Sequence, residues 1–201
     1  MVRTPEDLRA HYEVERELAD RLRAATRGER IDLYSRVYDE LFRRVPNHPQ
    51  IHPDPALKQR IMRRNLAITR SFLKPDMTFV ELGAGDAALT MQAAPLCRES
   101  LALDVTDALI PRRDVPSNFR FVPTNGLSLL LPDCSADLVF SHQLMEHLHP
   151  DDARDQLEEI IRILKPGGCY ICITPSRIFG PHDVSRYFDE IATGLHLKEY
   201  T

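Results

Sequence analysis

The sequence has few of the features that would place the chain in a membrane or outside the cell. No apolar run approaches the ~20 residues that a membrane-spanning helix needs. The first 22 residues, MVRTPEDLRAHYEVERELADRL, carry charges throughout and lack the apolar segment of a secretory signal. We therefore expect a cytoplasmic protein that does not cross a membrane.

Cysteine is scarce too, and its spacing argues against zinc or redox chemistry. Cys97 and Cys134 stand alone, and only Cys169 and Cys172 have a CxxC spacing. These two lie in an apolar stretch typical of a strand, where residues three apart point to opposite faces. They could not share a metal there, so we expect the four cysteines to be small buried core residues.

A compact basic stripe with stacking aromatic residues is also missing. Basic side chains exceed acidic ones in residues 1–74, and acidic side chains exceed basic ones in the remainder. Within the basic half, however, the stretch EVERELADRLRAATRGER interleaves both signs at helical spacing, which suits ion pairs on a solvated helix face. We therefore expect no nucleic-acid partner.

The first part of the chain has a helical pattern. Six apolar side chains recur three and four residues apart between Tyr34 and Val45, which places them on one stripe of a helix. Four prolines in residues 46–55 then break the helix, and a further helix is expected over residues 55–73. We expect residues 1–74 to form an N-terminal helical extension that acts as a lid over a ligand site. Alternatively, these helices pack away from that site and only stabilise the chain.

From residue 77 onward, short apolar runs alternate with helical stretches, which is typical of βαβ units. The fold class predicted for residues 75–201 is α/β, with a doubly wound, Rossmann-like and mostly parallel sheet. The expected strands cover residues 78–82, 100–104, 119–123, 137–141 and 169–174. The helix before the last strand should end at KPGG, and its buried stripe should comprise Ala153, Leu157, Ile160, Ile161 and Leu164.

The stretch FVELGAGDAALT joins the first expected strand to a helix through a turn that contains Gly83 and Gly85. In an open α/β sheet, ligands bind beyond the carboxyl ends of the strands. Glycine at this point permits unusual backbone angles and lets a ligand approach the main chain closely. Alternatively, the two glycines only make a tight turn from strand to helix.

Acidic residues beside the turn discriminate between ligands. GAGDAA fits the dinucleotide fingerprint, in which the N-terminus of the helix holds a pyrophosphate. Glu81, however, lies two residues before Gly83, and Asp86 lies where the helix would meet that phosphate. Carboxylates repel a pyrophosphate and attract a ligand that carries an amino group. A cationic ligand is therefore favoured, and a nicotinamide-dependent oxidoreductase stays open as an alternative.

Four ordered segments, within about residues 75–175, resemble the class I S-adenosylmethionine-dependent methyltransferases, particularly those that act on small molecules. The segments are VELGAGDAA, LALDV, LPDCSADLVFSHQLMEHL and LKPGGCYICITP. The resemblance implies S-adenosylmethionine as cofactor and in-line transfer of its methyl group to an acceptor. Because SHQLMEH differs from the motif of amino-adenine methyltransferases, we expect a small-molecule acceptor of unknown identity. A non-catalytic module that keeps the cofactor fold is a further alternative.

The resemblance also implies a set of cofactor-binding residues at the carboxyl ends of the strands. The set is Glu81, Gly83, Ala84, Gly85, Asp104, Val105, Asn125, Gly126, Ser141 and His142. In the resembled family, the first four positions would line the pocket for the amino-acid portion of the cofactor. Asp104 would accept hydrogen bonds from the ribose hydroxyls, and Val105 would lie beside the adenine.

The remaining members of the set follow the third and fourth strands. Asn125 and Gly126 would meet the adenine amine, although Asn-Gly is also a common turn dipeptide, and both interpretations stay open. Ser141 and His142 would border the reacting methyl group. Ala87 stands where the family often has a third glycine, and we expect only modest crowding there.

The stretch HQLMEHLHPDD gathers histidines and carboxylates within a few residues. A metal site needs convergent ligands of fixed geometry, and this spacing matches no helix-borne HExxH pattern, so we expect no metal. His147 is instead a candidate general base, because imidazole titrates near neutral pH. A structural role for His147 in a helix fits the sequence equally well.

The C-terminal part of the chain is short for the resembled family, whose members usually have seven strands. SRYFDEIATGLHLKEYT leaves room for at most one short strand after the fifth. We therefore expect a domain without its last strands, either as a fragment or as a reduced version. An exposed fifth strand pairs readily with another chain, so we also expect a homodimer.

Overall fold

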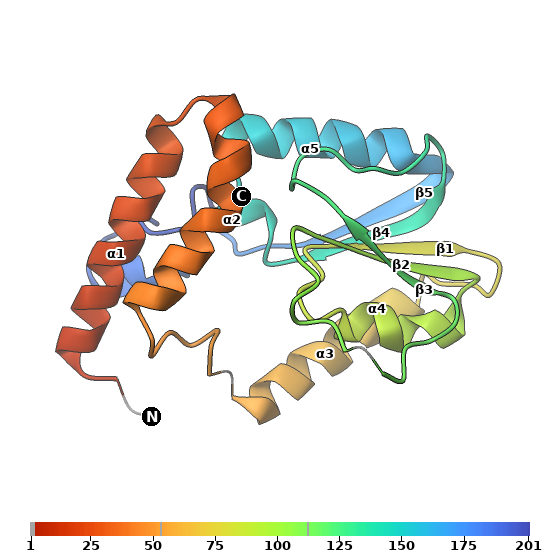
Figure 1. The fold of residues 1–201 in the computed structure, drawn as a ribbon, viewed down its shortest axis with the longest axis horizontal. Coiled ribbons are helices and arrows are strands. Elements are labelled where there is room, and N and C mark those ends of the chain that lie inside the picture. Colours follow the sequence, from red (N-terminus) through yellow and green to blue (C-terminus); the bar gives the residue numbers. More distant parts are fainter. Residues whose placement is uncertain (1–2, 53, 112) are drawn as a thin grey trace. The chain divides into compact units, whose positions relative to one another are not determined.

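The computed structural model describes residues 3–52, 54–111 and 113–201, and the chain forms two compact units (Figure 1). Unit 1 comprises residues 1–53, 143–153 and 174–201. Unit 2 comprises residues 54–142 and 154–173. Each unit draws on separate segments of the chain, whereas we expected one division at residue 74.

Unit 2 contains a five-stranded sheet in the order β3-β2-β1-β4-β5. Its strands are β1 (Thr78–Leu82), β2 (Glu99–Asp104), β3 (Phe119–Pro123), β4 (Ala136–His142) and β5 (Leu164–Ile173). All four strand pairings are parallel, which confirms the predicted Rossmann-like α/β fold. The strand order reverses between β1 and β4, so the carboxyl ends of the central strands meet at the point where such sheets bind ligands.

Helices cover both faces of this sheet (Figure 1). They are α3 (Pro55–Arg70) and α4 (Ala88–Ala93) on one face and α5 (Pro150–Ile163) on the other. On the first face, Met62 and Leu66 of α3 and Leu89 of α4 pack around Phe79 and Phe140, which are fully buried. The apolar strands and helix stripes therefore form a core that fixes the strand ends in place.

The connection from α5 to β5 differs from the prediction in two respects. Ile161 is 71% exposed, whereas Ile160 is buried. Adjacent residues of a helix point about 100° apart, and here Ile160 rather than Ile161 faces the sheet, so placing Ile161 in the buried stripe was wrong. The KPGG stretch also belongs to β5, where the register with β4 shifts and Gly167 has a φ of 83°.

The four cysteines are free, and they are not all core residues. Cys97 is buried beneath α4, whereas Cys134 and Cys172 are exposed. Cys134 lies in the turn before β4, and Cys172 lies on the edge strand β5, so neither position is enclosed by packing from both sides. The prediction of buried cysteines was therefore wrong for these two.

Unit 1 is built on α1 (Pro5–Ala24) and α2 (Arg27–Arg44). Both helices begin with a capping box, formed by Thr4 with Asp7 and by Thr26 with Glu29, which explains where they start. The remaining elements are the short 3-10 helices η2 (Met145–His147) and η3 (Val184–Tyr187). In the described ranges, the chain beyond β5 adds one isolated parallel bridge, between Ser176 and Tyr200.

A buried ion pair joins α2 to the first turn of α5. Arg30 donates from Nε and Nη2 to the two oxygens of Asp152, at 2.5 and 2.7 Å. The Tyr34 hydroxyl donates to Asp152 Oδ2 at 2.7 Å and accepts from the backbone N–H of His149. These bonds lower the pKa of Asp152 below its ordinary value.

Within the part of the chain that the structure describes, no helix is both long and apolar enough to span a membrane.

Candidate functional site

The turn GAGDA between β1 and α4 has an unusual backbone. Gly83, Gly85 and Ala87 have φ values of 66°, 56° and 54°. The backbone N–H groups of Gly83 and Ala84 both donate to the carbonyl of Leu103 on β2, at 2.9 and 3.2 Å, which holds the turn against the neighbouring strand. Side chains disfavour such φ values, so glycine suits positions 83 and 85. At Ala87, which carries a side chain, the same conformation implies backbone strain, and the modest crowding expected there remains a prediction.

The space above Gly85 is open. A Cβ atom built on Gly85 would meet no atom within 4 Å, and the same holds for Gly126. Packing of the protein therefore does not require a glycine at either position. The backbone angle is one remaining reason for glycine, and the close approach of a ligand to the main chain is the other.

Asp104 connects the turn to the end of β2. Its Oδ2 accepts from the N–H of Gly85 at 2.8 Å, and its Oδ1 accepts from the N–H of Val105 at 2.7 Å. A carboxylate oxygen has two lone pairs, so this half-buried group can also accept from the hydroxyls of a ribose. Val105 is 44% exposed and offers apolar surface beside it.

Glu81 is buried and belongs to the support of α4. Its Oε2 accepts from the N–H of Thr90 at 3.0 Å and from the Thr90 hydroxyl. Burial, with smaller contributions from Asp86 and Asp104, raises the pKa of Glu81 to about 8. Lys58 of α3 lies 2.5 Å from Asp86 and offsets part of this charge. The carboxylates of Asp86 and Asp104 make the turn a site that favours positive charge, and Glu81 adds to it only when it loses its proton.

The turn after β3 is stabilised by Asn125 itself. Its Oδ1 accepts from the N–H groups of Leu127 and Ser128, at 3.0 and 2.8 Å. The carbonyl of Gly126 accepts from the side-chain amide of Gln156 at 2.7 Å. The turn interpretation of Asn125 and Gly126 therefore holds, and contact with adenine remains a prediction.

The residues at the end of β4 have partners in unit 2 that the sequence did not indicate. The Ser141 hydroxyl lies 2.7 Å from the hydroxyl of Tyr170 on β5. Arg64 of α3 donates to His142 Nε2 at 2.9 Å. Burial, and then the charge of Arg64, lower the pKa of His142 to about 4, so this ring is neutral at physiological pH. A role beside the methyl group remains a prediction for both residues.

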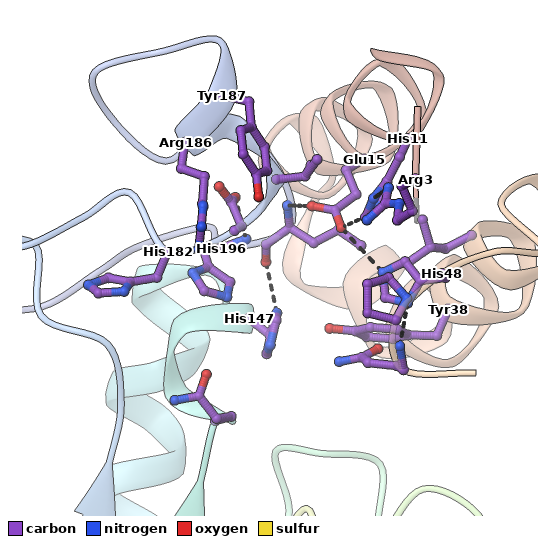
Figure 2. A pocket seen from close by; sticks show the side chains of 17 residues that line it. Arg3, His11, Glu15, Tyr38, His48, His147, His182, Arg186, Tyr187 and His196 are labelled. Carbon is purple, nitrogen blue, oxygen red and sulfur yellow. Dashed lines mark hydrogen bonds and ion pairs between the residues drawn. The ribbon is translucent and has the colours of Figure 1, made fainter. Parts of the chain in front are cut away.

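His147 belongs to unit 1, where it lines a cavity of about 310 Å³ (Figure 2). The cavity also gathers four other histidines, which are His11, His48, His182 and His196. The ring of His147 donates from Nδ1 to the carbonyl of Leu195 at 3.0 Å. Burial lowers its pKa to about 4, so it is a weaker base than an ordinary imidazole. Sequence reasoning missed the other histidines, because they lie far from one another along the chain.

Comparison with known proteins identifies the domain around the glycine turn. A family model described as a methyltransferase domain matches residues 80–172. A probable S-adenosylmethionine-dependent methyltransferase of Mycolicibacterium smegmatis is 33% identical over 110 residues, which are 51% of this chain and 40% of the relative. Phosphoethanolamine N-methyltransferase 1 of Triticum aestivum is 33% identical over 98 residues, 45% of this chain and 20% of the relative. The chain thus spans less than half of the length of either relative.

A solved structure shares the fold. Phosphoethanolamine N-methyltransferase 1 of Haemonchus contortus, in complex with phosphoethanolamine and S-adenosylhomocysteine, superposes with a TM-score of 0.65 at 18% identity. The match covers 88% of this chain and 39% of the other, and at this identity it concerns the fold alone. Over residues 80–172, the chain therefore carries a methyltransferase domain that is similar in sequence to S-adenosylmethionine-dependent methyltransferases, whose cofactor is S-adenosylmethionine.

Proposed function

We propose that the chain binds S-adenosylmethionine at the turn between β1 and α4 and transfers its methyl group to a small-molecule acceptor. The observation that carries the proposal is the open main chain at Gly85, flanked by the carboxylates of Asp86 and Asp104. S-adenosylmethionine is a cation with an amino group, and it matches this negative potential. A dinucleotide, with its pyrophosphate, does not.

Different residues of unit 2 hold different parts of the cofactor in this proposal. The main chain of Gly83, Ala84 and Gly85 offers close approach, Asp104 orients the ribose, and the exposed Val105 supports the adenine. When bound, the cofactor supplies a methyl group that its sulfonium already activates, so the protein mainly aligns the acceptor and excludes water.

The acceptor belongs to the proposal as a class only. Two of the proteins similar to this chain are named for methylation of phosphoethanolamine, so this amine is a suitable first acceptor to assay. The cytoplasmic location expected from the sequence is part of the same proposal. So is a homodimer that pairs through β5, which lies at one edge of the sheet.

Calorimetric titration of the chain with S-adenosylmethionine, S-adenosylhomocysteine and NADH tests the proposal. The first two should bind and NADH should not. Asp104→Asn should weaken both by about 10- to 100-fold, because hydrogen bonds to a charged acceptor contribute about 1.5–3 kcal/mol. Asp133→Asn is the matched control, because this exposed carboxylate pairs with Arg162 at the opposite end of β4. Binding of NADH alone would contradict the proposal.

Turnover needs a second assay. S-adenosylhomocysteine should accumulate when the chain is incubated with S-adenosylmethionine and a set of amines, phenols and carboxylic acids that includes phosphoethanolamine. The Asp104→Asn variant should form less product at the same cofactor concentration, with Asp133→Asn again as the control. Tight cofactor binding without product from any acceptor would instead favour a non-catalytic module.

A further inference from the structure

Three side chains from two segments of unit 1 lie close together, and two of them, His147 and His196, line the cavity in Figure 2. Glu146 and His147 lie in η2, shortly after β4, and His196 lies in the C-terminal segment. One ligand atom of each lies within 4.8 Å of those of the other two. His147 Nε2 is 4.0 Å from Glu146 Oε1, and the two imidazole rings are 4.9 Å apart in a T-shaped arrangement.

The neighbours of the two histidines fix their tautomers. His147 donates from Nδ1 to the carbonyl of Leu195, at 3.0 Å. His196 Nδ1 lies 2.8 Å from the carboxylate of Glu199, which can only accept, so this nitrogen also carries the proton. Both Nε2 atoms therefore keep a free lone pair when the rings are neutral. A carbonyl or carboxylate behind the second ring nitrogen is the usual support of a metal-binding histidine.

Glu146 supplies a third acceptor without a partner. Its side chain is fully buried, and its Oε2 accepts from the hydroxyl of Thr174 at 2.9 Å. Its Oε1 has no hydrogen-bond partner among the described residues. A buried carboxylate oxygen without a partner is costly, and a cation would satisfy it.

A second cluster in the same cavity shows why the tautomers matter. His11, Glu15 and His48 lie equally close together. Here, however, Arg3 donates to His11 Nδ1 at 2.5 Å, and the N–H of Gln50 donates to His48 Nδ1 at 3.2 Å. The protons of both rings are therefore on Nε2, which faces Glu15 at 2.6 and 3.6 Å. This cluster is a satisfied hydrogen-bond network and offers no nitrogen lone pair to a metal.

We propose that Glu146, His147 and His196 bind one divalent transition-metal ion, with Zn²⁺ as the ion that two imidazoles and a carboxylate fit best. Zinc bonds of about 2.0–2.2 Å in a tetrahedron place ligand atoms roughly 3.3 Å apart, so the side chains need to close only slightly. Three protein ligands leave at least one position for water or a polar group, and both histidines line the cavity. The site goes beyond methyl transfer and does not depend on it.

Metal titration of the full chain tests this site. After treatment with a chelator and dialysis, wild-type chain should bind one equivalent of Zn²⁺ in calorimetry and unfold at a higher temperature with Zn²⁺ than without it. Co²⁺ in place of Zn²⁺ should give the visible absorption of a site with nitrogen and oxygen ligands. Glu146→Gln and His196→Ala should each lower the affinity at least 100-fold. Glu199→Gln leaves the ligands in place and should lower it about 10- to 100-fold.

His11→Ala is the matched control, because it removes a histidine of the same cavity from the cluster that lacks free lone pairs. It should bind Zn²⁺ with the affinity of the wild-type chain. Glu146→Gln keeps the shape of the side chain, so it carries the test if His196→Ala does not fold, with far-ultraviolet circular dichroism as the check. Failure of the wild-type chain to bind Zn²⁺, wild-type affinity in Glu146→Gln, or an equal loss in His11→Ala would overturn the proposal.

Discussion

Replacing Gly85 by alanine separates what the backbone requires from what the ligand requires. Gly85 has a φ of 56°, and an added Cβ would meet no protein atom within 4 Å. The left-handed conformation costs a residue with a side chain about 1–2 kcal/mol. Alanine also restricts the unfolded chain more than glycine does, which raises the free energy of unfolding by about 0.4–1 kcal/mol. We therefore expect Gly85→Ala to lower the free energy of unfolding by about 1 kcal/mol, without any clash.

The same methyl group should have a larger effect on cofactor binding, because it occupies the open space through which the ligand approaches the main chain. We expect the affinity for S-adenosylhomocysteine to fall by more than tenfold. Urea unfolding followed by circular dichroism measures the stability, and calorimetry measures the affinity. Gly28→Ala is the control: Gly28 lies in α2, also with no atom within 4 Å of an added Cβ, and should stabilise the chain by about 0.5–1 kcal/mol.

The effects of Gly85→Ala on stability and on affinity can be tested separately. A Gly85→Ala chain as stable as the wild type would show that the turn does not need the observed backbone angle. Unchanged affinity for S-adenosylhomocysteine would show that the ligand does not approach Gly85.

Two further predictions concern buried ionisable groups. Asp152→Asn leaves the guanidinium of Arg30 buried without its counter-ion. The free energy of unfolding, measured by urea unfolding at neutral pH, should therefore fall by about 3–5 kcal/mol. An unchanged free energy of unfolding would show that the ion pair does not stabilise the fold. Glu81 has a pKa of about 8 in the folded chain and 4.5 as its ordinary value, so between these pH values the folded chain holds a proton that the unfolded chain has released. The contribution of Glu81 to the free energy of unfolding is therefore complete below pH 4.5. This contribution, at most about 5 kcal/mol, is lost as the pH rises to 8. Glu81→Gln should flatten that fall in urea titrations at several pH values, and an unchanged slope would assign the effect to other groups.

Local patterns in the sequence predict the sheet well. The apolar runs place β1 to β4 within about one residue of their observed bounds, because each run is buried and flanked by polar turns. The glycine turn and Asp104 are also found from sequence, since the turn must follow a strand and the acid must end the next one. The prediction for Ile161 was wrong because the spacing of apolar residues does not resolve which side of the helix faces the sheet. The prediction for KPGG was wrong because this stretch belongs to β5 and not to the end of the helix.

Contacts between distant segments could not be predicted in this way. Arg64 reaches His142, and Lys58 reaches Asp86, because α3 packs against the sheet, and no spacing along the chain encodes either pair. The proposed metal ligands were missed for the same reason. A search for ligands within HQLMEHLHPDD finds Glu146 and His147, but the third ligand, His196, comes from the C-terminal segment.

The most direct test of the central claim is native mass spectrometry of the purified chain in the presence of S-adenosylmethionine. The mass of the wild-type chain should increase by one molecule of S-adenosylmethionine or S-adenosylhomocysteine, and the Asp104→Asn chain should show little or no such complex under the same conditions. A wild-type chain that retains a dinucleotide, or that binds no nucleoside at millimolar S-adenosylmethionine, would contradict the claim that the acidic glycine turn holds this cofactor.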